Sequence, residues 1–564
     1  MTSASPSEGP DLRIARNRAR FDELVGRAED ELARGRLEAA AVCAQVAAAL
    51  AWHSPTGLFA SPRLESALRA IARESMTPLE PATRGTEIRT VLHVLTTAQR
   101  VGGHTRLAWR WIERDEGRVH SVAVTRQAHG PLPEAMLEAV RARGGRIHRI
   151  DRAASGIIAR AAALQTVAAQ ADLVVLHVHP FDVVPSIALA GLDRSGARPP
   201  AILLNHADHL FWIGLSSSDL VLHLRASGAR LSATRRGLSP DRSGILPVPL
   251  SPAPPPAQRE AARRLLGYSN GEVLAVSIAS GYKFGPADGD GLLPLLEQAL
   301  ERSQDLRVLA IGPGHRADWR AAAKRTAGRI ASLGNKDDLT AISAAADIYL
   351  DSYPFSSLTS MLEAGQLGLP LLAYGVTGPE TGVLGFDDPA TEGLAVRART
   401  PAEYLVALEA LVDDPAARRE RGQQIRRAIA ADHEGQGWRD HLERAYSQAA
   451  AVHASPRDEP HLDADPAPGA IGELDRRLVG LLDAQQADAP AGVRGHLRLA
   501  PFGLRLEEWR RSRGTAQPLS ILVLLPERAI MLARRAGMLA HSARRALRRS
   551  VRSRARPDHG GDAA

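Results

Sequence analysis

The stretch DIYLDSYPFSSLTSMLEAGQLGLP, residues 347–370, decides the fold class of this chain. A short apolar run ends at Asp351, and a Tyr-Pro pair and a hydroxyl-rich turn at 356–360 follow it. The turn opens a helix that contains Glu363 and ends at the Gly-Leu-Pro of 368–370, where a new apolar strand begins. This order predicts one strand–helix unit of a parallel α/β sheet. A helix start favours an anion, and a carboxylate one turn later can accept sugar hydroxyls, so the segment predicts a nucleotide-sugar site.

Similar apolar runs alternate with helical stretches in two series, one on each side of a Pro-rich stretch, SPAPPPAQRE, at residues 251–260. The first series comprises residues 91–97, 119–125, 171–179, 201–206 and 220–224, and the second comprises residues 272–280, 306–314, 329–334, 347–352 and 369–374. Runs without polar alternation are typical of parallel strands covered on both faces. We therefore expect two doubly wound, Rossmann-like α/β domains whose strand carboxyl ends face a shared cleft.

The domain boundaries follow from changes in composition. Residues 11–78 are rich in Ala with helical periodicity, and residues 454–470 are rich in Pro, Asp and Ala. The expected parts are a helical N-terminal region (1–85), a first Rossmann-like domain (86–250), a linker (251–260), a second Rossmann-like domain (261–452), a linker (453–470) and a helical region (471–564) that ends in an Arg-rich amphipathic tail.

The positive charge of the chain is concentrated in that tail. The formal net charge is +8 over 564 residues, but residues 528–556 hold ten arginines and no acidic residue, so the rest of the chain is slightly acidic. We therefore expect no nucleic-acid partner. In residues 519–557, apolar residues recur at helical spacing between the arginines, which is typical of an amphipathic helix on an anionic membrane surface. A helix packed on the body with a disordered basic end is the alternative.

The cellular compartment follows from two further features. Cys43 is the only cysteine, which excludes an internal disulfide and a zinc site built from cysteines. The first 20 residues have no apolar signal region, and no run approaches 18 apolar residues. We expect a cytoplasmic enzyme that the tail places at the inner face of the plasma membrane.

A glycine pair follows the first strand of the first series. Gly102 and Gly103 open a helix. The family resemblance described below implies that a turn of this kind brings backbone N–H groups near the donor phosphates or the acceptor, and we expect both glycines on the acceptor side. His104 comes next and can act as a base or contact the acceptor.

A second polar cluster follows the strand at 201–206. It contains Asn205, His206 and Asp208, and the aromatic pair Phe211-Trp212 comes directly after it. A histidine near an aspartate can supply a general base near pH 7, so His206 is the favoured base. The family resemblance described below implies that this loop, with Asn205 and Asp208, lies on the acceptor side. The aromatic pair suits a sugar face.

The segment 347–370 resembles the donor-binding segment of GT-B glycosyltransferases, in the group of the O-linked N-acetylglucosamine transferases, the bacterial cytoplasmic N-glycosyltransferases and related family-4-like sugar transferases. In that group a strand ending in Asp leads to a Pro-containing loop, two small hydroxyl residues and an acid one turn later. The resemblance implies that Thr359 and Ser360 meet the diphosphate and that Glu363 meets the ribose, where the O-linked enzymes place an Asp. It is close over this segment and holds in outline over residues 88–450.

Two glycine-flanked loops complete the expected donor side. Lys283 lies in SIASGYKFGP, residues 277–286, directly after a strand. GT-B enzymes of this type carry a lysine in the equivalent loop, so the resemblance implies that Lys283 neutralises the β-phosphate as UDP leaves. Gly312 and Gly314 end another strand tightly enough for a ligand to approach the backbone.

The resulting prediction is a hexosyltransferase-type GT-B enzyme that moves a sugar from a nucleotide donor, expected to be UDP-linked, to a protein or glycan acceptor. Basic side chains and helix dipoles handle the diphosphate in such enzymes, so we expect no metal and no cofactor. The sugar, the acceptor and the stereochemistry do not follow from the sequence. A nucleotide-sugar epimerase of the same fold and a non-catalytic binding module in a membrane-associated polysaccharide assembly are the alternatives.

Overall fold

The computed structural model describes residues 9–525, except for residues 82–84, 86, 101–102, 128–129, 253–257, 286–290, 337, 376–377, 379, 456–464, 466–470, 486–495 and 514–519. The chain divides into two compact units, residues 1–489 and residues 490–564, and each is described by itself.

The first unit contains a seven-stranded sheet within its described residues. The strands are β1 (Thr90–Leu95), β2 (Val119–Val124), β3 (Ile147–Arg149), β4 (Leu173–His177), β5 (Ala201–Asn205), β6 (Leu220–His223) and β7 (Ser243–Ile245). Their order is β3-β2-β1-β4-β5-β6-β7, and all neighbouring strands are parallel. The order reverses between β1 and β4, which is the switch point of a doubly wound sheet. The central strands β4 and β5 are buried at every position, as their unbroken apolar runs predict.

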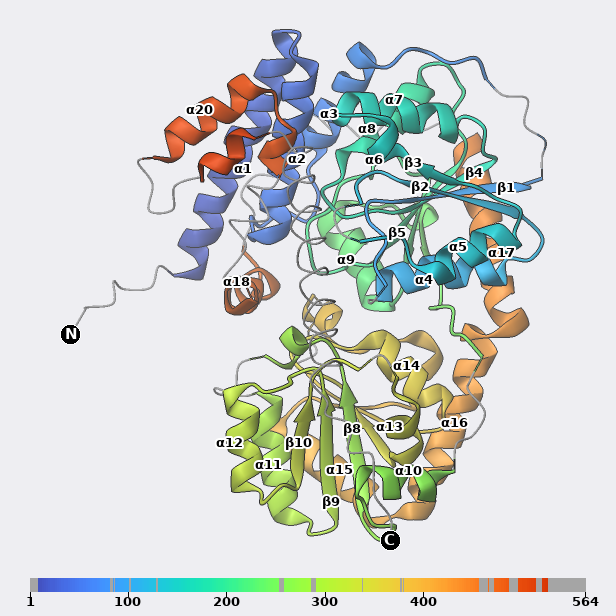
Figure 1. The fold of residues 1–564 in the computed structure, drawn as a ribbon, viewed down its shortest axis with the longest axis vertical. Coiled ribbons are helices and arrows are strands. Elements are labelled where there is room, and N and C mark those ends of the chain that lie inside the picture. Colours follow the sequence, from blue (N-terminus) through green and yellow to red (C-terminus); the bar gives the residue numbers. More distant parts are fainter. Residues whose placement is uncertain are drawn as a thin grey trace, which may run out of the picture. The chain divides into compact units, whose positions relative to one another are not determined.

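Helices lie on both faces of this sheet (Figure 1). They are α4 (Gly103–Arg114), α5 (Glu134–Ala142), α6 (Ile150–Ala153), α7 (Ile157–Ala168), α8 (Val183–Asp193) and α9 (Ala226–Arg236), preceded by α1 (Pro10–Ala33), α2 (Leu37–His53) and α3 (Pro62–Ser75). Helix α3 packs on α8, and the buried Glu65 of α3 accepts the backbone N–H groups of Gly214 (2.5 Å) and Leu215 (3.1 Å). These contacts fix the N-terminal helices to the first sheet.

A second sheet, of six strands in the described residues, belongs to the same unit. The strands are β8 (Val273–Ile278), β9 (Leu306–Ile311), β10 (Ile330–Leu333), β11 (Ile348–Leu350), β12 (Leu371–Tyr374) and β13 (Val396–Ala398). Their order, β10-β9-β8-β11-β12-β13, repeats the pattern of the first sheet, and all pairs are parallel. Two parallel, doubly wound sheets in one chain confirm the predicted fold class, α/β with the two Rossmann-like domains of a GT-B protein.

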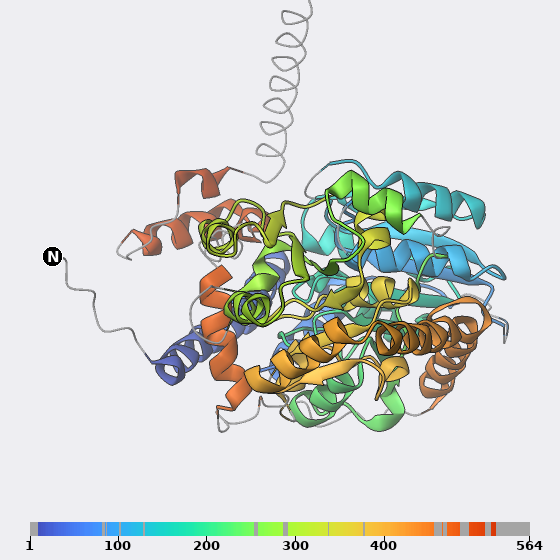
Figure 2. The ribbon, with the colours of Figure 1, turned by 90° about the horizontal axis from the view of Figure 1, so that it is seen from below.

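The helices of the second sheet divide between its two faces (Figures 1 and 2). They are α10 (Arg259–Leu266), α11 (Leu292–Arg302), α12 (Ala317–Arg325), α13 (Thr340–Ala345), α14 (Leu358–Gln366), α15 (Pro401–Asp413) and α16 (Pro415–His433). Helices α11, α12 and α15 share one apolar core with one face of the sheet, and α13, α14 and α16 share another core with the opposite face. Short 3-10 helices occur at η1 (Pro240–Arg242), η2 (Gly281–Phe284), η3 (Thr381–Leu384) and η4 (Pro389–Thr391).

Helix α17 (Gly435–Ala454) follows the second sheet in sequence and packs on the first. Trp438 donates its indole N–H to the carbonyl of Pro247 (2.8 Å), and Tyr446 donates its hydroxyl to Asp115 (2.8 Å). Both side chains are fully buried in an apolar core that also contains residues of both sheets. Helix α17 therefore joins the two domains through one continuous core. Helix α18 (Glu473–Gln485) packs against α1.

The second unit is described only in part. It contains η5 (Leu497–Leu499), α20 (Phe502–Ser512) and η6 (Ile521–Leu524), and Arg505 donates a hydrogen bond to the carbonyl of Leu524 (2.8 Å). Residues 526–564 lie outside the described part, and with them almost all of the predicted membrane-surface tail, 519–557. In the described parts of the chain, every helix is too short or too polar to cross a bilayer.

Candidate active site

The segment 347–370 forms the strand, turn and helix that its sequence predicts. The buried carboxylate of Asp351 follows β11 and accepts both the N–H and the hydroxyl of Ser357, each at 2.8 Å. The hydroxyl of Tyr349 donates to the carbonyl of Ile278 (2.8 Å) and also contacts the Ser357 hydroxyl (3.0 Å). These bonds hold the turn against β8 and set the start of α14 at Leu358.

Lys283 lies over this turn. It belongs to η2, the 3-10 helix after β8, and its Nζ donates a hydrogen bond to the carbonyl of Ser356 (2.6 Å). Arg316 holds both ends of the loop, because its guanidinium donates to the carbonyls of Gly285 (2.6 Å) and Gly281 (3.4 Å). Burial lowers the pKa of Lys283 to about 8, although the nearby Asp351 carboxylate opposes the shift. The cation is therefore fixed beside the start of α14.

Gly312 and Gly314 follow β9, next to the same loop. Both donate their N–H groups to the carbonyl of Leu333, at 2.8 and 3.0 Å. Gly312 has a φ of +127°, and a Cβ on it would overlap the carbonyl oxygen of Ala279. The space at Gly312 is taken by the backbone that leads into the Lys283 loop, and the approach of a ligand to these glycines stays a prediction.

The start of α14 meets the start of α4. A Cβ on Gly103 would lie 3.3 Å from Oγ1 of Thr359, so any larger residue at the first position of α4 would press on the Thr359 side chain. Thr359 and Ser360 are half-buried in the first turn of α14. The structure thus brings the predicted donor-side hydroxyls and the predicted acceptor-side glycine together. Gly102 lies outside the described residues. We call this meeting point of the two domains the junction.

Glu363 has partners that the sequence reading did not include. Arg106 donates to its Oε1 at 3.1 Å and Arg110 at 2.7 Å, both from α4 of the first domain. The two arginines are four residues apart and share one helix face, which was readable from the sequence, but their partner lies more than 250 residues away. Glu363 therefore links the two domains directly beside the predicted donor site.

His104 and His206 form a stacked pair at the junction. Their ring centroids are 4.0 Å apart, with 26° between the ring planes. His104 Nε2 faces the carbonyl of His177 at 2.9 Å, so it carries the proton and leaves Nδ1 as an acceptor. His206 Nδ1 faces the carbonyl of Leu204 at 3.4 Å, which leaves Nε2 as an acceptor.

Both rings are neutral near pH 7. Burial lowers the pKa of His206 to about 4. Burial, followed by the neighbouring His206, His179 and His177, holds the pKa of His104 well below its usual value. Each ring therefore presents a lone pair that can accept a proton.

Asn205 and Asp208 are buried beneath this pair. The amide of Asn205 contacts His223 Nδ1 (3.2 Å), and the Asp208 carboxylate pairs with Nε of Arg225 (3.0 Å). Arg225 also donates to the carbonyl of Gly385 in the second domain (2.6 Å). Burial raises the pKa of Asp208 to about 6, against the charge of Arg225. In this structure the side chains of Asn205 and Asp208 are held by other protein side chains, and a contact of either with an acceptor stays a prediction.

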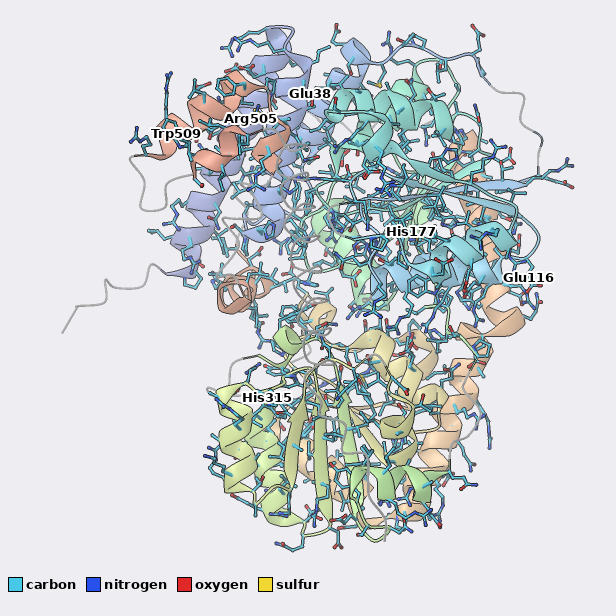
Figure 3. The ribbon with its side chains drawn as sticks, in the orientation of Figure 1. Glu38, Glu116, His177, His315, Arg505 and Trp509 are labelled. Atoms are coloured by element: carbon cyan, nitrogen blue, oxygen red, sulfur yellow. The ribbon has the colours of Figure 1, made fainter. Side chains whose placement is uncertain are left out.

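The aromatic residues at the junction are not the predicted ones. Phe211 and Trp212 are 2% and 3% exposed, so the interpretation that they face a sugar is wrong; they fill the core under the N-terminal helices. Phe355 of the hydroxyl-rich turn instead contacts the rings of His209 (5.3 Å) and Tyr282 (6.2 Å). Tyr282 is 54% exposed and precedes Lys283, so it is the aromatic face available to a ligand. Figure 3 shows His315, which follows Gly314, beside α12, where it is exposed.

No protein-family model matches the chain, and no curated protein matches it. Several solved structures do match the chain. A mutant of the O-GlcNAc transferase of Thermobaculum terrenum is 16% identical, with 77% of this chain and 85% of that chain covered and a TM-score of 0.47. HepE of Anabaena, solved in complex with UDP and glucose, is 13% identical, with coverages of 64% and 99% and a TM-score of 0.48. WaaG, a glycosyltransferase involved in lipopolysaccharide biosynthesis, is 16% identical, with coverages of 65% and 100% and a TM-score of 0.43. These are glycosyltransferases of GT-B fold, and at such identities the likeness is one of fold.

Proposed function

We propose that this chain is a glycosyltransferase that transfers a sugar from a UDP-linked donor to a protein or glycan acceptor. The observation that carries the proposal is the contact between Gly103 and Thr359, the starts of α4 and α14. His104 follows Gly103 in α4, and Lys283 donates to the turn before α14, so a base on α4 would be close to an anion bound at the start of α14. A phosphate held by α14 and an acceptor held by α4 would therefore be neighbours.

On the donor side, the diphosphate would bind at the first turn of α14. The hydroxyls of Thr359 and Ser360 and the helix dipole favour an anion there. Lys283 would exchange its bond to the Ser356 carbonyl for a phosphate oxygen. Its positive charge then stabilises the negative charge that develops on UDP as the sugar leaves.

On the acceptor side, the stacked histidines would accept the proton. The acceptor oxygen or nitrogen forms a bond to C1 of the sugar, the bond from C1 to the phosphate oxygen breaks, and its electron pair leaves with UDP. The acceptor's proton passes to Nδ1 of His104 or Nε2 of His206, the lone pairs that the hydrogen bonds leave available. The negative charge of a bound diphosphate raises the pKa of both rings towards neutrality, where they act best as bases.

The proposal includes metal independence. The site is built from a lysine, hydroxyl groups and a helix start, a set that suits phosphate oxygens. Within the described ranges, no group of three or more His, Cys, Asp or Glu is arranged to hold a metal ion. We expect UDP release from a UDP-sugar to be unchanged by EDTA. A loss of release that Mg²⁺ or Mn²⁺ restores would contradict this part of the proposal.

Calorimetric titration with UDP, ADP and GDP tests the donor site. We expect UDP to bind best, and Lys283→Ala to weaken it by about tenfold or more, since a hydrogen bond to a charged group is worth about 1.5–3 kcal/mol. Lys324→Ala is the matched control, because Lys324 is exposed on α12. Equal UDP affinities for Lys283→Ala and the wild-type protein would refute the donor site.

The products distinguish transfer from epimerisation. A transferase releases UDP from UDP-glucose, UDP-galactose or UDP-N-acetylglucosamine when an acceptor is supplied, and mass spectrometry of a treated lysate identifies the modified acceptor. An epimerase returns an altered UDP-sugar without net UDP release. Detection of that product would replace the proposed function with the epimerase.

A further inference from the structure

Three buried histidines form a row across neighbouring strands of the first sheet. His120 lies on β2, His93 on β1 and His177 on β4, three adjacent strands, and all three side chains are fully buried. The register pairs His93 with Val122 and Val175, so its two histidine neighbours are diagonal and share its face of the sheet. His120 Nδ1 lies 2.9 Å from His93 Nε2, and His93 Nδ1 lies 3.0 Å from His177 Nε2. Each contact is a nitrogen–nitrogen hydrogen bond.

Asp115 ends this row on the side of β2. Its Oδ2 lies 3.2 Å from His120 Nε2 and accepts the hydroxyl of Tyr446 (2.8 Å). Its Oδ1 accepts from Arg118 (2.9 Å), which Glu443 also holds. Burial alone would raise the pKa of Asp115. The contact with His120 and the charge of Arg118 outweigh burial and lower this pKa. The row therefore starts from a carboxylate anion that only accepts hydrogen bonds.

The anion sets the tautomer of every ring. His120 presents Nε2–H on the side of Asp115, because a lone pair there would face the carboxylate, although the 3.2 Å contact is not aligned as a hydrogen bond. Its Nδ1 then accepts Nε2–H of His93, whose Nδ1 in turn accepts Nε2–H of His177. His177 Nδ1 is left as a lone pair, fully buried and without a hydrogen-bond partner among the described residues.

The backbone of His177, the residue with the open lone pair, contacts the junction. The backbone carbonyl of His177 accepts Nε2–H of His104, the ring stacked on His206 (2.9 Å). Burial, followed by the neighbouring His206, lowers the pKa of His177 to about 3. Figure 3 shows His177 among the strands of the first sheet. Apolar side chains at these three positions would avoid desolvating three imidazoles, so packing alone does not account for the row.

We propose that His177, His93, His120 and Asp115 form a reversible proton relay that carries a proton between Nδ1 of His177 and the carboxylate of Asp115. We call these four residues the histidine relay. A proton binds His177 Nδ1, and the proton on His177 Nε2 moves to His93 Nδ1. The proton on His93 Nε2 moves to His120 Nδ1, and that on His120 Nε2 moves to Asp115. The carboxylate becomes neutral only briefly, because its lowered pKa favours loss of the proton, and the reverse sequence then returns that proton to His177. Each ring stays neutral in its other tautomer while the carboxylate is protonated.

The relay rests on the proposed function only for the source of its proton, the acceptor group. Its structure can be tested without turnover, in full-length protein labelled with ¹⁵N-histidine. We expect NMR couplings across the two nitrogen–nitrogen hydrogen bonds to connect three neutral rings in series, all in the Nε2–H form. Absence of a connected series of three, or an Nδ1–H form in any of its members, would overturn the proposal.

The variant Asp115→Asn gives a second reading. Arg118 holds the amide oxygen in the place of Oδ1, so the amide N–H₂ faces His120 Nε2 and donates to it. All three rings must then switch to the Nδ1–H form, while Glu116→Gln, the same change on the adjacent exposed residue, leaves them as they are. A correctly folded Asp115→Asn protein whose three rings do not switch together would overturn the relay. If this variant does not fold, the couplings of the wild-type protein still decide.

The link to turnover is tested with His93→Leu, which interrupts the relay in its middle. With UDP-glucose as donor and water as acceptor, we expect kcat to fall by about tenfold while the UDP affinity stays unchanged. Measurements of kcat in mixtures of H2O and D2O should show several protons moving in the wild-type protein and one in the variant. An unchanged kcat and profile in a folded variant would overturn the catalytic use of the relay and leave the glycosyltransferase proposal standing. Failure of the wild-type protein to bind UDP would refute that proposal, and the NMR result would stand.

Discussion

Arg110 on α4 donates a 2.7 Å hydrogen bond to Glu363 on α14, across the junction of the two domains. Arg110 is nearly buried and Glu363 is 29% exposed, so the pair is partly shielded from solvent. The resemblance assigns Glu363 to the donor's ribose, and the structure gives it a role between the domains. Both roles can be separated, because Arg110 can be removed while the carboxylate stays.

We predict that Glu363→Gln weakens UDP binding by about tenfold, since a hydrogen bond from a ribose hydroxyl to a charged carboxylate is worth about 1.5 kcal/mol or more. Arg110→Met removes the shorter of the two ion pairs of Glu363 and keeps both the carboxylate and its contact with Arg106. It should weaken UDP binding by no more than about twofold, in keeping with the small value of partly exposed pairs. Calorimetric titration of both variants decides. Equal losses would show that Glu363 acts on UDP only through the ion pair.

The pH dependence of donor binding should follow Lys283. Its pKa is lowered to about 8 by burial, so the ammonium is present below that pH and is lost as the pH rises through it. UDP affinity should therefore fall between pH 7 and 9, and the fall should be absent in Lys283→Ala. In Lys324→Ala the wild-type pH profile should persist. A profile that is flat in the wild-type protein would remove Lys283 from the diphosphate site.

The strand, turn and helix of the segment 347–370 could be predicted from the sequence because the patterns that indicate them are local. An apolar run, a Pro-containing turn and a helix stop at 368–370 act within a few residues of one another, and β11, α14 and β12 follow them. Continuous apolar runs likewise predict both parallel sheets. Fold class depends on such repeated local patterns, so it could be read from one sequence.

The contacts between distant residues could not be read in this way. Nothing in the sequence near His93 or His120 points to a row of histidines, because the row depends on which strands become neighbours and in which register. The packing of α17 on the first sheet, after the chain has left it, is of the same kind. Phe211 and Trp212 misled for the related reason that the N-terminal helices, far away in sequence, cover them.

Stability should depend on pH through His433 at the end of α16. Its Nδ1 contacts the Val248 carbonyl (2.9 Å) and its Nε2 contacts Asp388 (3.1 Å), with Asp432 nearby. Burial alone would lower the pKa of His433. The hydrogen bond and the charge of Asp388 outweigh burial and raise this pKa above its ordinary value of 6.5. A raised pKa means that the folded chain binds the proton more tightly, so this stabilisation is complete below pH 6.5 and is lost as the pH rises through the folded value.

We therefore predict that the free energy of unfolding of the wild-type protein declines from pH 6 towards pH 8.5 and that His433→Gln flattens part of this decline. Denaturant titrations at a series of pH values measure it. His441→Gln is the control, because His441 is on the same side of the molecule, near Asp432, but is partly exposed. An identical decline in His433→Gln would show that other groups cause it.

The tail prediction concerns residues 519–557, of which only 520–525 are described. Its arginines would attract anionic headgroups, each contributing about 1 kcal/mol near the surface, and its apolar face would insert between them. Deletion of 519–557 should therefore abolish sedimentation with phosphatidylserine vesicles, and binding by the full chain should fall steeply between 50 and 300 mM salt, since the Debye length shortens to roughly 8 Å at 0.15 M. The same deletion should leave UDP affinity unchanged. Replacement of the ten arginines of 528–556 by glutamine separates charge from apolar insertion, and undiminished binding after both changes would contradict a membrane role for the tail.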